Sequence, residues 1–523
     1  MAMMPPLTVP ELGLSESEAQ ARFERLQERL VPLWQRISRI NDSPQTIVVV
    51  PSQTVDFDCQ GAEMQAYEER MLFMVLLLRQ SRARMIYVTS QSILRATVDY
   101  YLSLMPGIVN SHALGRFFNV AVEDRTPRPL TIKLLERPHV CERIRSLIDD
   151  PMNAHMVPFN VTLHERNLAL RLGIPLYGAD PKFWQLGSKS GSREVFAVAG
   201  TSYPIGYEEL RGYDDVLRSL ADLRRKKPTL PNAMVKLNEG VSGEGNAVVD
   251  FTGLPAPDSA DADTALKARL HDIQFESSAV TFDDFFQKMS QLGGIVEERI
   301  QGRNFCSPSV QLRVTPLGDV EILSTHDQLL GGPSGQSFLG SQFPASPDYG
   351  PLIAAEALKI GKRLAELGVL GRFAVDFVVV QDDEDRWRAY AIEINLRKGG
   401  TTHPFLILQF LTDGQYDHDT GIFRAPSGKA KCYVTGDHLE SSLYHAFTPG
   451  DLIEILMHHN LHFDQARQTG ILAHMLATVG ENGRFGVVAV GDTIDEAKGL
   501  YARVQAVVKD EAHTALQTRP LPE

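Results

Sequence analysis

The chain has 523 residues, of which 43% are hydrophobic and 22% are charged. A chain of this length and ordinary globular composition should hold roughly two to four domains. Its net charge of -13 argues against a broad surface for nucleic acid or for an anionic membrane, so any phosphate site must be a local group of Lys and Arg.

The four cysteines, Cys59, Cys141, Cys306 and Cys432, lie far apart and include no CxxC pair. They predict neither a zinc site nor a disulfide framework, and they fit a reducing cytoplasm. The start of the chain has no basic region followed by an apolar one, so we expect no signal peptide. The apolar run 71–78 is too short to span a bilayer and is predicted to be a buried helix face.

The first third of the chain is predicted to alternate between helices and strands. Residues 15–40 have an amphipathic helical pattern, and the β-branched run 46–52 predicts a strand that opens a new unit. The alternation continues to about residue 180, with a helix at 62–80, a strand at 85–90 and a helix at 161–172. This order favours a parallel α/β layer.

The patterns change after residue 181. A mainly helical stretch extends to about residue 230, strands return from 233, and a helix is predicted at 351–367. The Gly/Ser/Pro-rich segment 331–350 is predicted to be a long loop, a feature that is often functional. The tail, 430–512, predicts strand, helix, strand, turn, strand and helix. The expected fold is therefore α/β and α+β multidomain, with units at 1–43, 44–180, 181–425 and 426–523.

The segment 373–397 contains two apolar strands joined by a polar turn. Side chains alternate between the two faces of a strand. One face should carry Val375, Phe377 and Val379 with Ile392, Ile394 and Leu396, and the other Asp376 with Glu393, Asn395 and Arg397. Oxygen ligands on one face suit Mg²⁺ that is shared with phosphates. A sheet with one solvent-facing side explains the same alternation.

A glycine-rich hairpin precedes these strands. Lys236 lies on a strand, and Gly240, Gly243 and Gly245 occupy the turn that leads to a second strand. Glycine lets backbone N–H groups approach phosphate, and a lysine adds charge, although an ordinary β-turn explains the glycines equally. Upstream, Lys189 lies at a Ser/Gly-rich helix start, which also fits a capped helix with solvated charge.

In chain order these features resemble the ATP-grasp family over roughly 181–410. The strongest element is the strand with Glu393 and Asn395, followed by Arg397. The resemblance implies two α+β lobes that clamp ATP between antiparallel sheets, with ATP and two Mg²⁺ ions as cofactors. It places the ATP phosphates on Lys189, Lys236 and the glycine turn, adenine on Glu297, Glu298 and Ile300, and the metal on Asp376, Glu393 and Asn395. Asn304 stands where many members carry an acid for the ribose.

A narrower resemblance covers most of the chain. The blocks GSKSGSREVFAVAG, STHDQLLGG, QFPASPDYG, EINLRKGGTTHPF and TGILAHMLATVGENGRFGVVAVGD are similar to the pheganomycin-type peptide ligases. That group implies an α/β pre-ATP-grasp domain at 44–180, an ATP-grasp core at 181–425 and a family-specific C-terminal domain at 426–523. Its chemistry is the ATP-dependent joining of a carboxylate to an amine.

The resemblance therefore implies a cytoplasmic ligase that forms an amide through an acyl phosphate. Arg397 is a candidate catalytic residue, because its guanidinium could bind the γ-phosphate or the acyl group through two hydrogen bonds. His326 could orient substrate or act as a base, or it could form a structural hydrogen bond with Asp327. His403 could line the acceptor pocket or cap a helix.

The expected partners are a small carboxylate and an amine or peptide, with no nucleic acid and no membrane. A homodimer is compatible with the resemblance because dimers are common in ATP-grasp enzymes. Two alternatives remain open from the sequence. One is an ATP-grasp enzyme with an acceptor other than an amine, and the other is a nucleotide-binding regulatory or scaffold protein without turnover.

Overall fold

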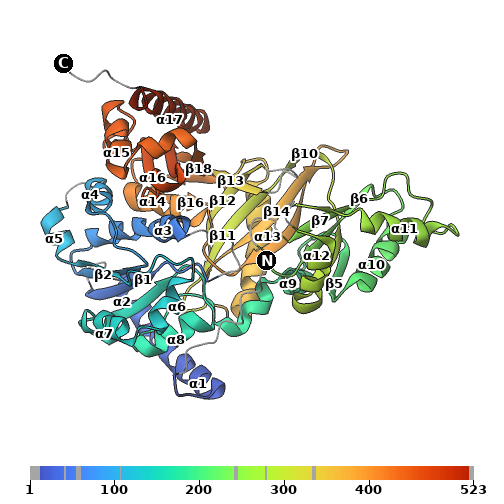
Figure 1. Cartoon of the computed structure of the whole chain (residues 1–523), viewed down its shortest axis with the longest axis horizontal. Helices are drawn as coiled ribbons and strands as arrows, with labels where there is room; N and C mark the ends of the chain where they lie inside the picture. The colour runs from blue at the N-terminus through green and yellow to red at the C-terminus, as the bar shows by residue number, and fades with distance from the viewer. Residues whose placement is uncertain are drawn as a thin grey trace.

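Three β-sheets organise the chain, and helices cover their faces (Figure 1). The computed structural model describes residues 12–39, 43–54, 61–105, 108–240, 245–276, 280–331 and 337–517. Gly243 of the predicted phosphate turn lies outside the described residues. Among the described helices, none combines the length and the apolar character that crossing a membrane would require.

The first sheet is parallel, with strand order β3-β2-β1-β4, and confirms the predicted α/β layer. Its strands are β1 (Gln45–Val50), β2 (Ala83–Thr89), β3 (Phe117–Ala121) and β4 (Ala154–Pro158). Its helices are α1 (Glu16–Gln27), α2 (Leu30–Arg39), α3 (Gly61–Glu69), α4 (Arg95–Ser103), α5 (Asn110–Leu114), α6 (Leu130–Leu135), α7 (Pro138–Ser146) and α8 (Leu163–Leu172). Helix α8 ends at Gly173, whose φ of 70° suits a residue without a side chain.

The predicted helix at 62–80 is two elements. α3 ends at Glu69, and the apolar run forms a separate 3₁₀ helix, η1 (Leu72–Arg79). Six side chains of η1 are buried, as the sequence predicted. They belong to a core cluster that also includes Phe343, Phe405 and Tyr433, so η1 packs the α/β layer against the C-terminal half of the chain.

The second sheet forms the lobe drawn in green, with strand order β5-β9-β6-β7-β8. Its strands are antiparallel: β5 (Gly206–Leu210), β6 (Asn232–Leu237), β7 (Asn246–Asp250), β8 (Gln274–Phe275) and β9 (Gly294–Glu298). Helices α10 (Tyr213–Lys226), α11 (Ala262–His271) and α12 (Phe282–Leu292) belong to this lobe, and apolar residues of all three enter its core.

The third sheet is large and antiparallel, with strand order β10-β14-β11-β12-β13-β18-β20-β19, and β15 pairs with β14. Its strands are β10 (Arg303–Cys306), β11 (Pro308–Val314), β12 (Val320–Gly331), β13 (Ser337–Phe343), β14 (Gly371–Gln381), β15 (Trp387–Asn395), β18 (Cys432–Glu440), β19 (Gly470–His474) and β20 (Arg484–Gly491). Helices α9 (Lys189–Ala199) and α13 (Gly350–Glu366) pack on one part, and α17 (Ile494–Ala515) packs on β18 and β20. Further elements are η3 (Pro181–Gly187), α14 (Thr402–Thr412), α15 (Pro449–His458), and the β16–β17 ribbon (Gln415–Asp417, Ile422–Arg424).

One prediction about this sheet is wrong, and the sheet also continues past a predicted domain boundary. The segment 331–350 is not one long loop, because β13 pairs with β12 on one side and with β18 on the other. The same pairing, with Phe343 opposite Tyr433, carries the sheet across the boundary expected at residue 425. The C-terminal strands therefore extend the sheet of the preceding unit.

A bulge in β15 corrects the predicted faces of the acidic hairpin. Asp376 pairs with Glu393, but the next residue, Phe377, pairs with Ala391. Ile392 is thus the extra residue, and such a bulge turns its side chain away from strict alternation. Ile392 lines the same cleft as Glu393, whereas it was predicted to share the core face of Ile394.

Candidate active site

A cleft of about 780 Å³ lies where the three sheets meet. The α/β layer contributes Gln53, Glu63, Tyr67, Arg70 and Phe159 to its wall. Among the residues predicted from the sequence, those assigned to charged and metal-binding roles also line it: Lys189, Lys236, Asp376, Glu393, Asn395 and Arg397. The C-terminal strands contribute Asp437, His438 and Arg484. The structure therefore brings together the predicted phosphate and metal residues.

The acidic face of β14 and β15 has the arrangement predicted from the sequence. Asp376 and Glu393 are cross-strand partners, and the Asn395 side-chain amide donates a hydrogen bond to Asp376 Oδ2 at 3.0 Å. Gln328 of β12 donates to Asp376 Oδ1 at 3.1 Å. Burial, with the nearby Glu393 carboxylate, raises the pKa of Asp376 to about 6. Two carboxylates held this close are stabilised by a bound cation.

Lys189 reaches this acidic face from the first turn of α9. Its ammonium lies 3.0 Å from Glu393 Oε1, and the lysine side chain is almost fully buried. The turn is fixed by Asn238, whose backbone oxygen accepts from the Lys189 N–H at 3.1 Å and whose side-chain oxygen accepts from the Ser190 N–H at 3.1 Å. Asn238 follows β6 directly, so the end of β6 holds the start of α9.

Lys236 on β6 is held by a buried carboxylate. Its Nζ lies 2.6 Å from Glu297 Oε1, and Arg193 Nη1 lies 3.0 Å from Glu297 Oε2. Arg193 also contacts Glu208, at 2.5 Å, and its guanidinium lies over the Tyr203 ring. The Glu297 carboxylate therefore positions two positively charged side chains, those of Lys236 and Arg193.

The glycines of the hairpin after Lys236 lie close to the backbone on the other side of the turn. A Cβ built on Gly240 would lie 3.2 Å from Gly245 N, and one built on Gly245 would lie 3.2 Å from Glu239 O. Both glycines line the cleft. A side chain at either position would therefore crowd the opposite strand of the hairpin.

The remaining residues of the predicted nucleotide site divide into two groups. Glu298 and Ile300 line the cleft at the strand that joins the lobes, and Glu298 Oε1 accepts from the Ile205 N–H at 2.9 Å. Asn304 does not belong to the cleft wall. It is exposed, with a φ of 50°, and its amide donates to Gln381 at 2.7 Å. This position corrects the assignment of Asn304 to the nucleotide.

His326 was predicted to be catalytic, and its position is wrong for contact with substrate. It is fully buried, and its Nε2 lies 2.7 Å from Tyr433 Oη beside the Phe343 ring. Burial lowers the pKa of His326 to about 3, so the ring is neutral at physiological pH. Asp327 points elsewhere and accepts from Tyr349 Oη at 2.8 Å. The predicted His–Asp hydrogen bond is therefore absent, because neighbours on a strand face opposite sides.

Comparison with known families decides the identity of the central region. A family profile described as "IQCH-like, ATP-grasp" matches residues 264–419. The chain contains an ATP-grasp domain. The matched range includes β14 and β15 with the three residues predicted to bind metal. A second profile, described as "PGM1 C-terminal domain", matches residues 451–504, beyond the ATP-grasp match.

Two curated relatives extend the likeness beyond the ATP-grasp domain. The L-propargylglycine--L-glutamate ligase of Streptantibioticus cattleyicolor is 27% identical over 84% of this chain and 89% of its own length. IQ motif-containing protein H of Danio rerio is 22% identical over 94% of this chain, which spans 50% of that protein. Pyruvate carboxylase of Rhizobium etli has a similar fold, with a TM-score of 0.50 and 15% identity over 88% of this chain and 37% of that one.

The part of the cleft wall formed by α3 and the C-terminal strands was not predicted from the sequence. Arg484 Nη1 lies 2.9 Å from Glu63, and Arg70 Nη1 lies 3.0 Å from Asp437. Glu63 and Tyr67 lie on α3 and Arg70 directly follows it, so the three have helical spacing. That signal was present in the sequence, but a solvated polar helix face has the same spacing. Their partners are more than 360 residues away in sequence, so no local pattern connects them.

Proposed function

We propose that this protein is an ATP-dependent ligase that joins a carboxylate to an amine, with release of ADP and phosphate. The observation that carries the proposal is the Asp376–Glu393 cross-strand pair, with Asn395 beside it and Lys189 on Glu393, in one cleft. The Streptantibioticus ligase, with 27% identity over most of both chains, supports the same reaction class.

The chemistry explains why such a site needs ATP. A carboxylate resists attack by an amine because the leaving group would be oxide. In the proposed first step a carboxylate oxygen attacks the γ-phosphorus, the bond to the bridging oxygen breaks, and ADP leaves. The amine nitrogen then attacks the acyl carbon, inorganic phosphate leaves, and the amine loses its extra proton. Both steps concentrate negative charge, so the site must supply cations and hydrogen-bond donors.

The residues of the cleft fit these needs. The carboxylates of Asp376 and Glu393, with the Asn395 amide oxygen, form a hard oxygen donor set that would hold two Mg²⁺ ions. Mg²⁺ there would neutralise charge on the β- and γ-phosphates. The raised pKa of Asp376, due first to burial and then to Glu393, fits a site that is completed by a cation.

Lys236 and Lys189 would bind the phosphates of ATP. Lys236, fixed by Glu297, would hold the α- and β-phosphates from the hairpin side, where Gly240 and Gly245 line the cleft. Lys189 would leave Glu393 for phosphate once that carboxylate binds the metal. Glu298 and Ile300 would border adenine on the strand between the lobes.

Arg397 is the best candidate for contact with the reacting group. It is partly buried at the cleft wall, close enough to Glu393 and Asp376 for their charges to oppose the lowering of its pKa by desolvation. Its planar guanidinium can bind two oxygens at once, either of the γ-phosphate or of the acyl group, and lysine cannot copy that geometry.

Hydroxylamine trapping tests the reaction. With ATP, Mg²⁺ and a library of carboxylates, we expect ADP to form only with suitable carboxylates and hydroxylamine to capture the acyl group as a hydroxamate. Arg397→Lys should fall sharply in rate while still binding ATP. Arg388→Lys is the matched control, because Arg388 is exposed on β15 and pairs with Asp382 away from the cleft.

The outcomes separate the candidate functions. If the carboxylate found in the product gives no ATP-dependent hydroxamate, the acyl-phosphate step is wrong. If ATP binds but no pair of carboxylate and amine releases ADP, a regulatory or scaffold role replaces the ligase. Full activity of Arg397→Lys would mean that Arg397 contributes only its positive charge and that binding through two hydrogen bonds is not required.

A further inference from the structure

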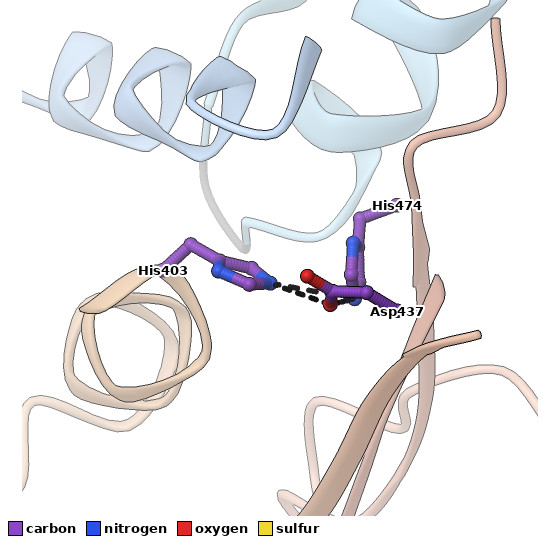
Figure 2. Close-up of side chains that lie close together, drawn as sticks. All are labelled: His403, Asp437 and His474. Atoms are coloured by element: carbon purple, nitrogen blue, oxygen red, sulfur yellow. Dashed lines mark hydrogen bonds and ion pairs between the residues drawn. The ribbon is translucent and has the colours of Figure 1, made fainter. Parts of the chain in front are cut away.

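Three buried side chains that the proposed ligase chemistry does not use converge behind the cleft wall. His403 comes from α14, Asp437 from β18 and His474 from β19, and Figure 2 shows the two rings and the carboxylate directed at one point. Their relative exposures are 3%, 4% and 0%. Among the described residues, these three offer ligand atoms that all lie within 4.8 Å of one another, close enough to share one metal ion.

The distances between the three atoms match the edges of a tetrahedral site. His403 Nε2 lies 3.4 Å from His474 Nε2 and 3.6 Å from Asp437 Oδ1, and His474 Nε2 lies 3.7 Å from the same oxygen. Zn²⁺ bonds of about 2.0–2.1 Å at a tetrahedral angle separate two ligand atoms by roughly 3.4 Å. The two contacts to oxygen are too long for hydrogen bonds. The three atoms therefore surround a point at bonding distance.

A glycine makes this convergence sterically allowed. His474 pairs with Gly486 of β20, the strand that separates β19 from β18. A Cβ on Gly486 would lie 2.1 Å from His474 Cε1 and 2.6 Å from both ring nitrogens. The imidazole thus lies across β20 in space that any other residue would fill. On β18 the register shifts between Gly436 and Leu439, and Asp437 lies in that irregular segment.

The carboxylate is oriented by a second contact. Arg70 donates to Asp437 Oδ2 at 3.0 Å and leaves Oδ1 directed at the two imidazoles. Metal-binding carboxylates are commonly held in this way by an outer hydrogen bond.

We propose that His403, Asp437 and His474 bind one divalent transition-metal ion of the zinc class. Two imidazole nitrogens and one carboxylate oxygen favour zinc over magnesium, which prefers oxygen ligands. This site is separate from the Asp376–Glu393 face and does not depend on the ligase proposal. Three protein ligands leave a fourth position for water or a substrate group. The ion would join α14 to the C-terminal strands and fix Asp437 at the cleft wall.

Metal titration of the full chain tests the site without ATP. Protein stripped with a chelator is titrated with Co²⁺, whose visible absorption bands are intense in tetrahedral coordination, and Zn²⁺ is then added to displace it. We expect one Co²⁺ per chain with intense bands, loss of the bands on Zn²⁺ addition, and a melting temperature that rises when Zn²⁺ is restored. Any Co²⁺ that binds at the Asp376–Glu393 face would be octahedral and would add only weak absorption.

Variants locate the ion. Asp437→Asn and His474→Ala should each lose the intense bands and the Zn²⁺-dependent shift in melting temperature. His458→Ala is the matched control, because His458 is exposed on α15, and it should keep both. If a buried variant does not fold, Gly486→Ala displaces the ring instead and should lose the bands. Wild-type protein that gives no intense Co²⁺ bands and no Zn²⁺-dependent shift in melting temperature, or variants that keep both, would overturn the proposal.

Discussion

At the scale of single residues, Glu393 is the group on which the proposed site depends most. It pairs across the strands with Asp376, and it contacts the Lys189 ammonium at 3.0 Å. It therefore touches the proposed metal position and the proposed phosphate position at once. Its side chain is only partly buried at the cleft wall, so a neutral replacement should not disturb the core.

Glu393→Gln should therefore abolish most turnover and leave the fold intact. The amide keeps the shape but removes one ligand charge, and the rate should fall on the order of a hundredfold or more. Steady-state ADP release measures the loss, and circular dichroism checks the fold. Glu384→Gln, at an exposed glutamate in the turn of the same hairpin, should behave as wild type. Near-normal turnover of Glu393→Gln would exclude a metal role for this acid.

Lys398 offers a test of stability against pH. It is buried, its Nζ donates to Pro158 O at 2.5 Å, and burial, with repulsion from Arg372, lowers its pKa to about 7. An unfolded lysine titrates near about 10.4. Between these values the unfolded chain binds more protons than the folded one. This residue therefore makes the free energy of unfolding rise with pH across that window.

Lys398→Met should remove that contribution. The variant should lose stability relative to wild type as the pH is raised from about 7 to about 10, the window between the two pKa values. Urea unfolding at several pH values measures the difference. Lys359→Met, at an exposed lysine of α13, should show no such trend. A difference between Lys398→Met and wild type that stays constant with pH would mean that Lys398 is charged in the folded protein throughout.

At the scale of elements, the position of Lys189 depends on how α9 packs against η3. A Cβ on Gly191 would lie 2.0 Å from Gln185 O, so the first turn of α9 rests on backbone. Gly191 N also donates to Ser188 Oγ at 3.0 Å, the cap of the helix. Position 191 therefore requires glycine because of close packing, and not because of the backbone φ angle.

Gly191→Ala should push this turn away from η3. We expect a loss of roughly 1–3 kcal/mol in the free energy of unfolding, as for other overpacked sites, and weaker ATP binding because Lys189 moves. Gly499→Ala is the matched control in α17, where an added Cβ meets nothing within 4 Å, and it should stabilise the helix by up to about 1 kcal/mol. Equal effects of the two changes would contradict the packing argument.

The elements also show what the sequence could predict. The alternation around Asp376 and the pairing with Glu393 followed from strand geometry, because local spacing determines which face each side chain takes. The bulge at Ile392 did not follow, since an extra residue in one strand is defined only against its partner. His326 was misassigned for a similar reason: its partner, Tyr433, is 107 residues away and lies on a strand added from the C-terminal region.

At the scale of the whole molecule, the large antiparallel sheet continues across the domain boundary expected near residue 425. β13 pairs with β18, and one core cluster joins η1, Phe343, Phe405 and Tyr433. Sequence patterns predicted β18, α15, β19, β20 and α17 in the right order, although the short helix α16 (Val479–Asn482) lies where a turn was expected. They could not show that these strands extend an existing sheet, because pairing partners of that kind are set by the packed fold and leave no local signal.

A chain that ends at residue 425 should therefore fail to behave as a folded unit. It would leave β13 as an unpaired edge, which invites aggregation, and would expose aromatic residues whose burial stabilises the fold by roughly 1.5–3 kcal/mol each. We expect low soluble yield and strong binding of a hydrophobic dye. A chain that ends at residue 517 is the control and should remain soluble. If the shorter chain is instead monomeric and gives the near-ultraviolet circular dichroism of packed aromatic residues, the boundary predicted from the sequence is a true domain boundary.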